Sequence, residues 1–187
     1  MGSSLALAAF SVGIGGLFFL DRDESVRTSK ALWLPVIWIW IIGSRPVGVW
    51  LGLWSDVATA SQLMDGSPVD RAVFAALLIA GIVVLIGRGS RVMSLLRANW
   101  LILIYFGYCL LSTLWSDFPD VAFKRWTKAV GDLVMVLIVT TDPEPLAALK
   151  RLFSRTGFIL LPASVLLIKY FPGLGRGYDP WFGTPFY

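Results

Sequence analysis

The sequence predicts an all-α protein whose helices cross a lipid bilayer several times. Apolar residues make up 57% of the 187-residue chain and charged residues only 15%, whereas an ordinary soluble domain has roughly 25% charged residues. The charges fall between long apolar blocks, and a helix that spans a bilayer needs about 20 mostly apolar residues. The chain therefore has room for about six spans joined by short loops, and we expect a polytopic transmembrane helical bundle.

Six blocks with little or no charge define the expected spans, because an ionisable group at mid-bilayer costs about 2.5 to 3.5 kcal/mol on insertion scales. These blocks cover residues 4–20, 31–54, 69–87, 98–115, 127–141 and 157–171. Ser44, Arg45 and Pro46 interrupt the second block, which is predicted to kink or end there. The fifth block contains Asp132 and the sixth contains Pro162. Residues 1–187 are expected to form a single transmembrane domain.

The basic residues predict the orientation of the spans, since Lys and Arg near span ends are retained on the cytoplasmic side. The first, third and fifth loops hold nine of these residues, and the opposite side holds six. We therefore expect the N-terminus, the loop 117–128 and the C-terminal tail on the non-cytoplasmic side of an inner or plasma membrane. Most tryptophans fall near proposed span ends, where indole rings favour the headgroup layer. Trp38 and Trp40 are exceptions.

Composition also argues against several classes of function. The sequence contains no histidine, which is the commonest metal ligand and near-neutral proton shuttle, so we expect no metal and no cofactor. The Lys and Arg residues lie between apolar blocks and not on the one continuous face that nucleic-acid binding requires, so no nucleic-acid partner is expected. The single cysteine, Cys109, lies in an apolar block and cannot form an intramolecular disulfide.

The most informative stretch is residues 111–132, where an apolar span meets a charged loop and the chain re-enters the membrane. Pro119 marks a possible helix start. Arg125, Lys128 and Asp132 then lie at i, i+3 and i+7, within about 60° of one another. Two cations above a buried carboxylate would bind an anion at the membrane surface, since Arg offers phosphate a planar fork and Lys a point charge. Alternatively, the cations only anchor a span end, and Lys128 neutralises Asp132.

The C-terminal tail, residues 173–187, is rich in Gly, Pro and aromatic residues and contains Arg176. Its glycines do not follow a strand or open a helix, so they do not form a nucleotide-binding motif. An irregular loop at the membrane interface is the expected structure. Such a loop either cradles a polar group attached to a lipid or simply connects neighbouring elements.

The stretch LWSDFPDVAFKRWTKAVGDL, together with ALWLPVIWIWIIGSRPVGVWLG and DGSPVDRAVF, resembles the O-antigen ligase and O-antigen polymerase family, and in particular its exopolysaccharide polymerases. In that family a Leu-Trp-Ser motif, a spaced Pro and a spaced Arg form an outward-facing loop and short helix. The matching residues here are Leu114, Trp115, Ser116, Pro119 and Arg125. The resemblance extends over most of the chain, from about residue 31 to residue 187.

The resemblance implies a metal-independent glycosyl transfer at the outer face of the membrane during synthesis of surface polysaccharide. A polyprenyl-diphosphate-linked glycan would donate its sugar chain to an acceptor hydroxyl, with diphosphate leaving and cations stabilising its charge. By position, Arg125 would contact the diphosphate with Lys128 and Arg176 as partners. Asp132 would hold this cluster, Trp115 would border the lipid, and other subunits of a polysaccharide assembly system are possible partners.

One departure from the family concerns the end of the chain. Members of the family usually have more spans and continue past a segment like GYDPWFG into a large outer loop, whereas this sequence stops at Tyr187 and has no histidine. We therefore expect it to be the N-terminal portion of such a protein, without the catalytic half. A small multispan transporter, with its pathway marked by Asp132, residues 44–46 and Pro162, and a non-catalytic membrane partner are the alternatives.

Overall fold

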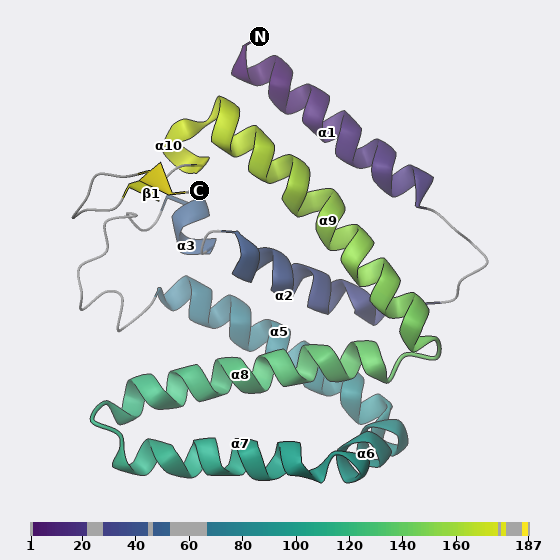
Figure 1. The fold of residues 1–187 in the computed structure, drawn as a ribbon, viewed down its shortest axis with the longest axis vertical. Helices are drawn as coiled ribbons and strands as arrows, with labels where there is room; N and C mark the ends of the chain where they lie inside the picture. The colour runs from purple at the N-terminus through teal and green to yellow at the C-terminus, as the bar shows by residue number, and fades with distance from the viewer. Residues whose placement is uncertain are drawn as a thin grey trace. The chain divides into compact units, whose positions relative to one another are not determined.

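The computed structural model describes residues 2–21, 28–44, 47–52, 67–175, 177–178 and 185–186. This part of the chain is helical (Figure 1), apart from one antiparallel pair of two-residue strands. The predicted all-α class is thereby confirmed. The chain divides into two compact units, one formed by Met1–Arg27 with Lys150–Tyr187 and the other by Thr28–Leu149.

The unit Thr28–Leu149 contains the predicted anion site. Its elements in chain order are η1 (Lys30–Leu32), α2 (Trp33–Gly43), α3 (Val47–Trp50), α5 (Pro68–Gly87), α6 (Gly89–Ala98), α7 (Trp100–Ser112), η2 (Thr113–Trp115) and α8 (Pro119–Thr140). Both long helices of this unit, α5 and α8, begin with Pro at the first position and carry Asp in the first turn. Proline lacks only an N–H that has no partner at that position, and an acid there favours the helix dipole.

Three helices, α2, α5 and α8, pack together to form the core of this unit. The buried cluster combines Trp38 of α2, Leu85 of α5 and four residues of α8, and Ile138 has no exposed surface. Helices α5 and α8 approach each other closely at Gly81, where a Cβ atom would lie 2.6 Å from Val134 Cγ1. Helix α8 is therefore the central element, since it also contacts α7.

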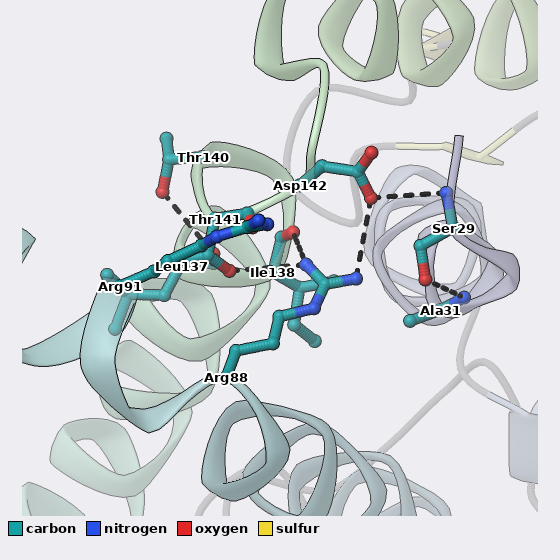
Figure 2. A network of polar contacts seen from close by, with 9 residues as sticks. All are labelled: Ser29, Ala31, Arg88, Arg91, Leu137, Ile138, Thr140, Thr141 and Asp142. Carbon is teal, nitrogen blue, oxygen red and sulfur yellow. Dashed lines mark hydrogen bonds and ion pairs between the residues drawn. The ribbon is translucent and has the colours of Figure 1, made fainter. Parts of the chain in front are cut away.

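A network of polar contacts holds the C-terminal end of α8 (Figure 2). Arg88, directly after α5, donates from Nη1 to the Ile138 carbonyl at 2.8 Å and to Thr141 Oγ1 at 3.2 Å. Its Nη2 forms an ion pair with Asp142 Oδ2 at 3.4 Å, and the Ser29 N–H donates to the same oxygen at 3.2 Å. Arg88 thus satisfies carbonyl and hydroxyl groups at a helix end and joins it to α5 and to the start of η1.

The smaller unit contains α1 (Ser3–Leu20), most of α9 (Pro145–Tyr170), α10 (Pro172–Gly175), β1 (Gly177–Tyr178) and β2 (Pro185–Phe186). Helices α1 and α9 lie antiparallel (Figure 1). Edge-to-face ring pairs join them, with centroid distances of 6.4 Å between Phe10 and Tyr170 and 5.8 Å between Phe18 and Phe158. The strands pair with Gly177 opposite Phe186. The tail predicted to be irregular therefore contains this short antiparallel pair.

Three helices in the described residues are long and apolar enough to cross a membrane: Ser3–Leu20, Pro68–Gly87 and Pro145–Tyr170. The count rises to four if α6 and the helix Trp100–Trp115, which meet at 85°, form one broken span. By length and composition the chain is a membrane protein. The expected number of about six spans is not confirmed.

Two expected spans account for the difference between six and four, and the block 98–115 is counted among the four only together with α6. The block 31–54 does not form one long helix, because α2 ends at Gly43 after 11 residues, which is about 17 Å against a hydrocarbon core of about 30 Å. Arg45 and Pro46, at the predicted break, lie outside the described residues. The block 127–141 is the second half of α8, which has 22 residues but also Lys124, Arg125, Lys128 and Asp132 along its length.

Replacing Arg88 by Met should lower the free energy of unfolding by about 3 to 5 kcal/mol, because Asp142 would remain buried without its cation. The measurement is a denaturant titration in zwitterionic micelles followed by circular dichroism. The control is Arg97→Met, because Arg97 is exposed and makes no side-chain hydrogen bond or ion pair within the described residues. Arg88→Met with Asp142→Asn should recover part of the loss. Equal stability of Arg88→Met and the control would contradict the assignment of Arg88.

Candidate functional site

The motif residues Trp115, Ser116 and Pro119 form the turn between α7 and α8. Helix α7 continues as the 3-10 turn η2, which ends at Trp115. Ser116 Oγ then accepts a hydrogen bond from the Phe118 N–H at 3.3 Å, and Pro119 is the first residue of α8. The helix start predicted at Pro119 is confirmed, so Arg125, Lys128 and Asp132 do follow one another on a continuous helix.

A hydrogen bond from an indole joins the two helices on either side of this turn. Trp126 of α8 donates from Nε1 to the Phe106 carbonyl of α7 at 3.0 Å. The ring of Phe123 stacks on Trp126 with centroids 5.7 Å apart. Because Trp126 follows Arg125 directly, this hydrogen bond fixes the backbone that carries the arginine. It thereby sets the direction in which the arginine side chain leaves α8.

Arg125 and Lys128 are both exposed but have different surroundings. Arg125 makes no hydrogen bond or ion pair within the part of the chain that the structure describes. Lys128 Nζ lies 5.8 Å from the centroid of the Phe74 ring of α5, which is within the range of a cation–π contact. The guanidinium of Arg125 therefore remains available to an external partner, whereas the ammonium of Lys128 lies over a ring.

Asp132 lies differently from the buried, cation-holding carboxylate that the sequence predicts. Asp132 is exposed, and no ion pair joins it to Lys128. Its Oδ1 accepts a hydrogen bond from Trp38 Nε1 at 2.7 Å. The reason is geometric, because Lys128 leans towards Phe74 while Trp38 crosses from α2 at the level of Gly131. Asp132 therefore neither holds Arg125 nor is neutralised by Lys128.

We define the Trp38 cluster as Trp38, Phe74, Lys128, Gly131 and Asp132. Trp38 is 2% exposed, and its ring meets that of Phe74 edge-to-face at a centroid distance of 4.9 Å. Its indole lies so close to α8 that a Cβ atom on Gly131 would overlap the six-membered ring. Three helices thus fix the indole, and its N–H fixes one oxygen of Asp132.

Exposed aromatic rings lie at the α7–α8 turn. Trp115 is 64% exposed and Phe118 60%, and the Trp115 ring lies 6.3 Å from that of Tyr108. Aromatic rings of this kind favour the headgroup layer of a membrane. The turn thus places exposed indole and phenyl rings beside the first turns of α8, close in sequence to Lys124 and Arg125.

The predicted site residues and those that the structure brings together differ in part. Arg176 lies outside the described residues, so its predicted role beside Arg125 stays a prediction. Trp38, Phe74 and Gly131 were not predicted as site residues. One signal was available for Trp38, because an indole away from a span end needs a hydrogen-bond acceptor, and Asp132 is the one carboxylate between residues 121 and 141.

No protein family, curated protein or solved structure matches the chain.

Replacing Gly131 by Ala should displace the Trp38 ring, lower stability by about 1 to 3 kcal/mol through overpacking, and break the hydrogen bond to Asp132. Nitrogen-15 spectra of the indole N–H groups in micelles measure this directly. The signal that disappears in Trp38→Phe should shift in both Gly131→Ala and Asp132→Asn. The matched control is Gly107→Ala in α7, where a Cβ atom would meet nothing within 4 Å. A Trp38 signal unchanged by Gly131→Ala would contradict this packing.

Proposed function

We propose that the chain is a membrane glycan ligase-like or polymerase-like protein that binds a polyprenyl-diphosphate-linked oligosaccharide at the outer face of an inner or plasma membrane. The observation that carries the proposal is the exposed guanidinium of Arg125 on the first turns of α8, which has no partner among the residues that the structure describes. Arg125 follows the exposed rings of the α7–α8 turn, Phe118 and Trp115, by seven and ten positions in the sequence. The resemblance of the segment 114–133 to O-antigen ligases and polymerases supports the same function.

The chemistry of this ligand matches the two parts of the site. A polyprenyl diphosphate combines a long apolar chain, which stays in the bilayer, with a doubly charged group in the headgroup layer. Arginine binds phosphate oxygens through two parallel N–H donors, and charge-assisted hydrogen bonds of this kind are among the strong ones. Trp115 and Phe118 offer apolar surface at the level where the lipid chain meets the diphosphate.

In the proposed reaction the bond between the anomeric carbon of the donor glycan and the diphosphate oxygen breaks. The acceptor hydroxyl oxygen forms a new bond to that carbon and releases its proton to water, and the polyprenyl diphosphate leaves with the bonding electrons. The negative charge on the leaving group increases as the bond breaks. Arg125 would stabilise that charge, which is the kind of fixed electrostatic contribution that accelerates group transfer. No residue of this chain is proposed as the base.

Replacing Arg125 by Gln should weaken binding of a polyprenyl diphosphate roughly 10- to 100-fold, as expected for the loss of hydrogen bonds to a charged group. The measurement is a binding titration of the whole purified chain in micelles with undecaprenyl diphosphate. The monophosphate of the same lipid should bind more weakly to the wild type, and its affinity should change less in the variant.

The matched control for this experiment is Lys30→Gln, which removes an equal charge from an exposed lysine next to Ser29, at the opposite end of α8 from Arg125. It should leave diphosphate affinity unchanged within about twofold, since its effect is only long-range and screened. Equal diphosphate affinity in the wild type and in Arg125→Gln would overturn the proposal. Ion or solute flux through vesicles containing the purified chain, unaffected by Arg125→Gln, would favour a transporter instead.

A further inference from the structure

Helix α6 is the one strongly amphipathic helix among the shorter helices of the unit Thr28–Leu149 that the structure describes. Val92 and Leu96 on its apolar face pack against the buried cluster of α2, α5 and α8. On its other side, Ser90, Arg91, Ser94 and Arg97 are all exposed. These four residues lie within about 120° of one another around the helix axis, and we call them the α6 polar face.

The geometry of α6 places this face parallel to the membrane surface if α7 crosses the membrane. Helix α6 and the helix Trp100–Trp115 meet at 85°, so one lies along the bilayer plane when the other lies along its normal. Trp100 at the junction is 57% exposed, and indole rings favour the headgroup layer. A short amphipathic helix with arginines on its polar face is typical of an element that rests in that layer.

Within the part of the chain that the structure describes, no acidic residue neutralises the positive charge of the polar face. No Asp or Glu occurs between Asp70 and Asp117, and Asp142, the acid that reaches this region, is paired with Arg88. Arg91 donates from Nη1 to the Thr141 carbonyl at 3.3 Å, which is a neutral acceptor. Arg97 makes no side-chain hydrogen bond or ion pair within the described residues.

The position of α6 is fixed, so the two arginines form a preorganised surface and do not move freely with a loop. Arg88 and Arg91 tie both sides of the α5–α6 junction to the end of α8, at Ile138 and Thr141. Ser94 Oγ donates to the Arg91 carbonyl at 2.8 Å, so its one hydroxyl proton is used within the helix. This surface lies at the opposite end of α8 from Arg125, about 24 Å away along the helix axis.

We propose that the α6 polar face binds the phosphate of anionic phospholipids in the leaflet at the C-terminal end of α8. Arg91 and Arg97 supply the charge, and Ser90 supplies a hydroxyl donor on the same face. A zwitterionic lipid carries an ammonium group that two arginines repel, so the site selects headgroups with net negative charge. This site is independent of the proposed diphosphate site on α8.

The test measures lipid selectivity locally at α6. Ala98, an exposed residue at the end of α6, is changed to Cys in a Cys109→Ser background and labelled with bimane, and the whole chain is reconstituted into vesicles. Brominated phosphatidylglycerol should quench the label with an apparent affinity at least fivefold higher than brominated phosphatidylcholine, since each arginine near the surface contributes about fivefold. High salt should reduce this preference.

Variants of the same labelled protein decide the outcome. Arg97→Gln should lose about fivefold of the preference, Arg91→Gln with Arg97→Gln should abolish it, and Arg97→Lys should largely retain it. Arg71→Gln, which lowers the net charge equally at the start of α5, should leave it unchanged. Equal quenching by both lipids in the wild type, or a preference that persists in the double variant, would overturn the proposal. Arg97→Gln keeps the test decisive if Arg91→Gln disturbs folding.

Discussion

The structure of the larger unit depends on the hydrogen-bond and ion-pair partners of the polar groups at the C-terminal end of α8, which lie inside an apolar bundle. The last carbonyls of any helix lack partners within the helix, and here Arg88 and Arg91 donate to Ile138 and Thr141. Asp142 is 4% exposed and would be costly to bury without Arg88. Because Arg88 follows α5 directly and Ser29 precedes η1, this one network aligns α2, α5 and α8. The close packing at Gly81 and Gly131 requires that alignment.

Prediction from the sequence succeeds where the signal is local. Pro119 and Asp120 define the start of α8 by chemistry that acts within one turn, so the spacing of Arg125, Lys128 and Asp132 on one helix is correctly predicted. Their partners are not, because each partner comes from another helix. Phe74 lies 54 positions before Lys128 and Trp38 lies 94 positions before Asp132. Pairing within one helix at i and i+4 is the natural expectation, and packing between helices overrides it here.

The number of spans is hard to predict for a related reason. Apolar windows identify helices such as Pro68–Gly87 and Pro145–Tyr170, in which only 11% and 6% of the apolar window is buried. Helix α8 is long enough to span a bilayer, but its first half carries cations and its second half forms the buried core. Helix α2 is apolar throughout but short. Both helices contribute to the core by packing against each other, so hydropathy alone does not say whether lipid or protein surrounds them.

The balance of charge at the candidate site explains how Lys128 and Asp132 would act together with Arg125. A diester diphosphate carries two negative charges, and one arginine compensates only one of them. The contact of Lys128 with Phe74 contributes only about 0.5 to 1 kcal/mol at an exposed position, whereas a hydrogen bond to a charged group contributes about 1.5 to 3 kcal/mol. A bound diphosphate would therefore draw Lys128 away from the ring. Because Trp38 and not Lys128 holds Asp132 Oδ1, no ion pair has to break for this movement. The hydrogen bond from Trp38 thus takes one of the two carboxylate oxygens of Asp132, and the second cation, Lys128, stays without an ion pair to it.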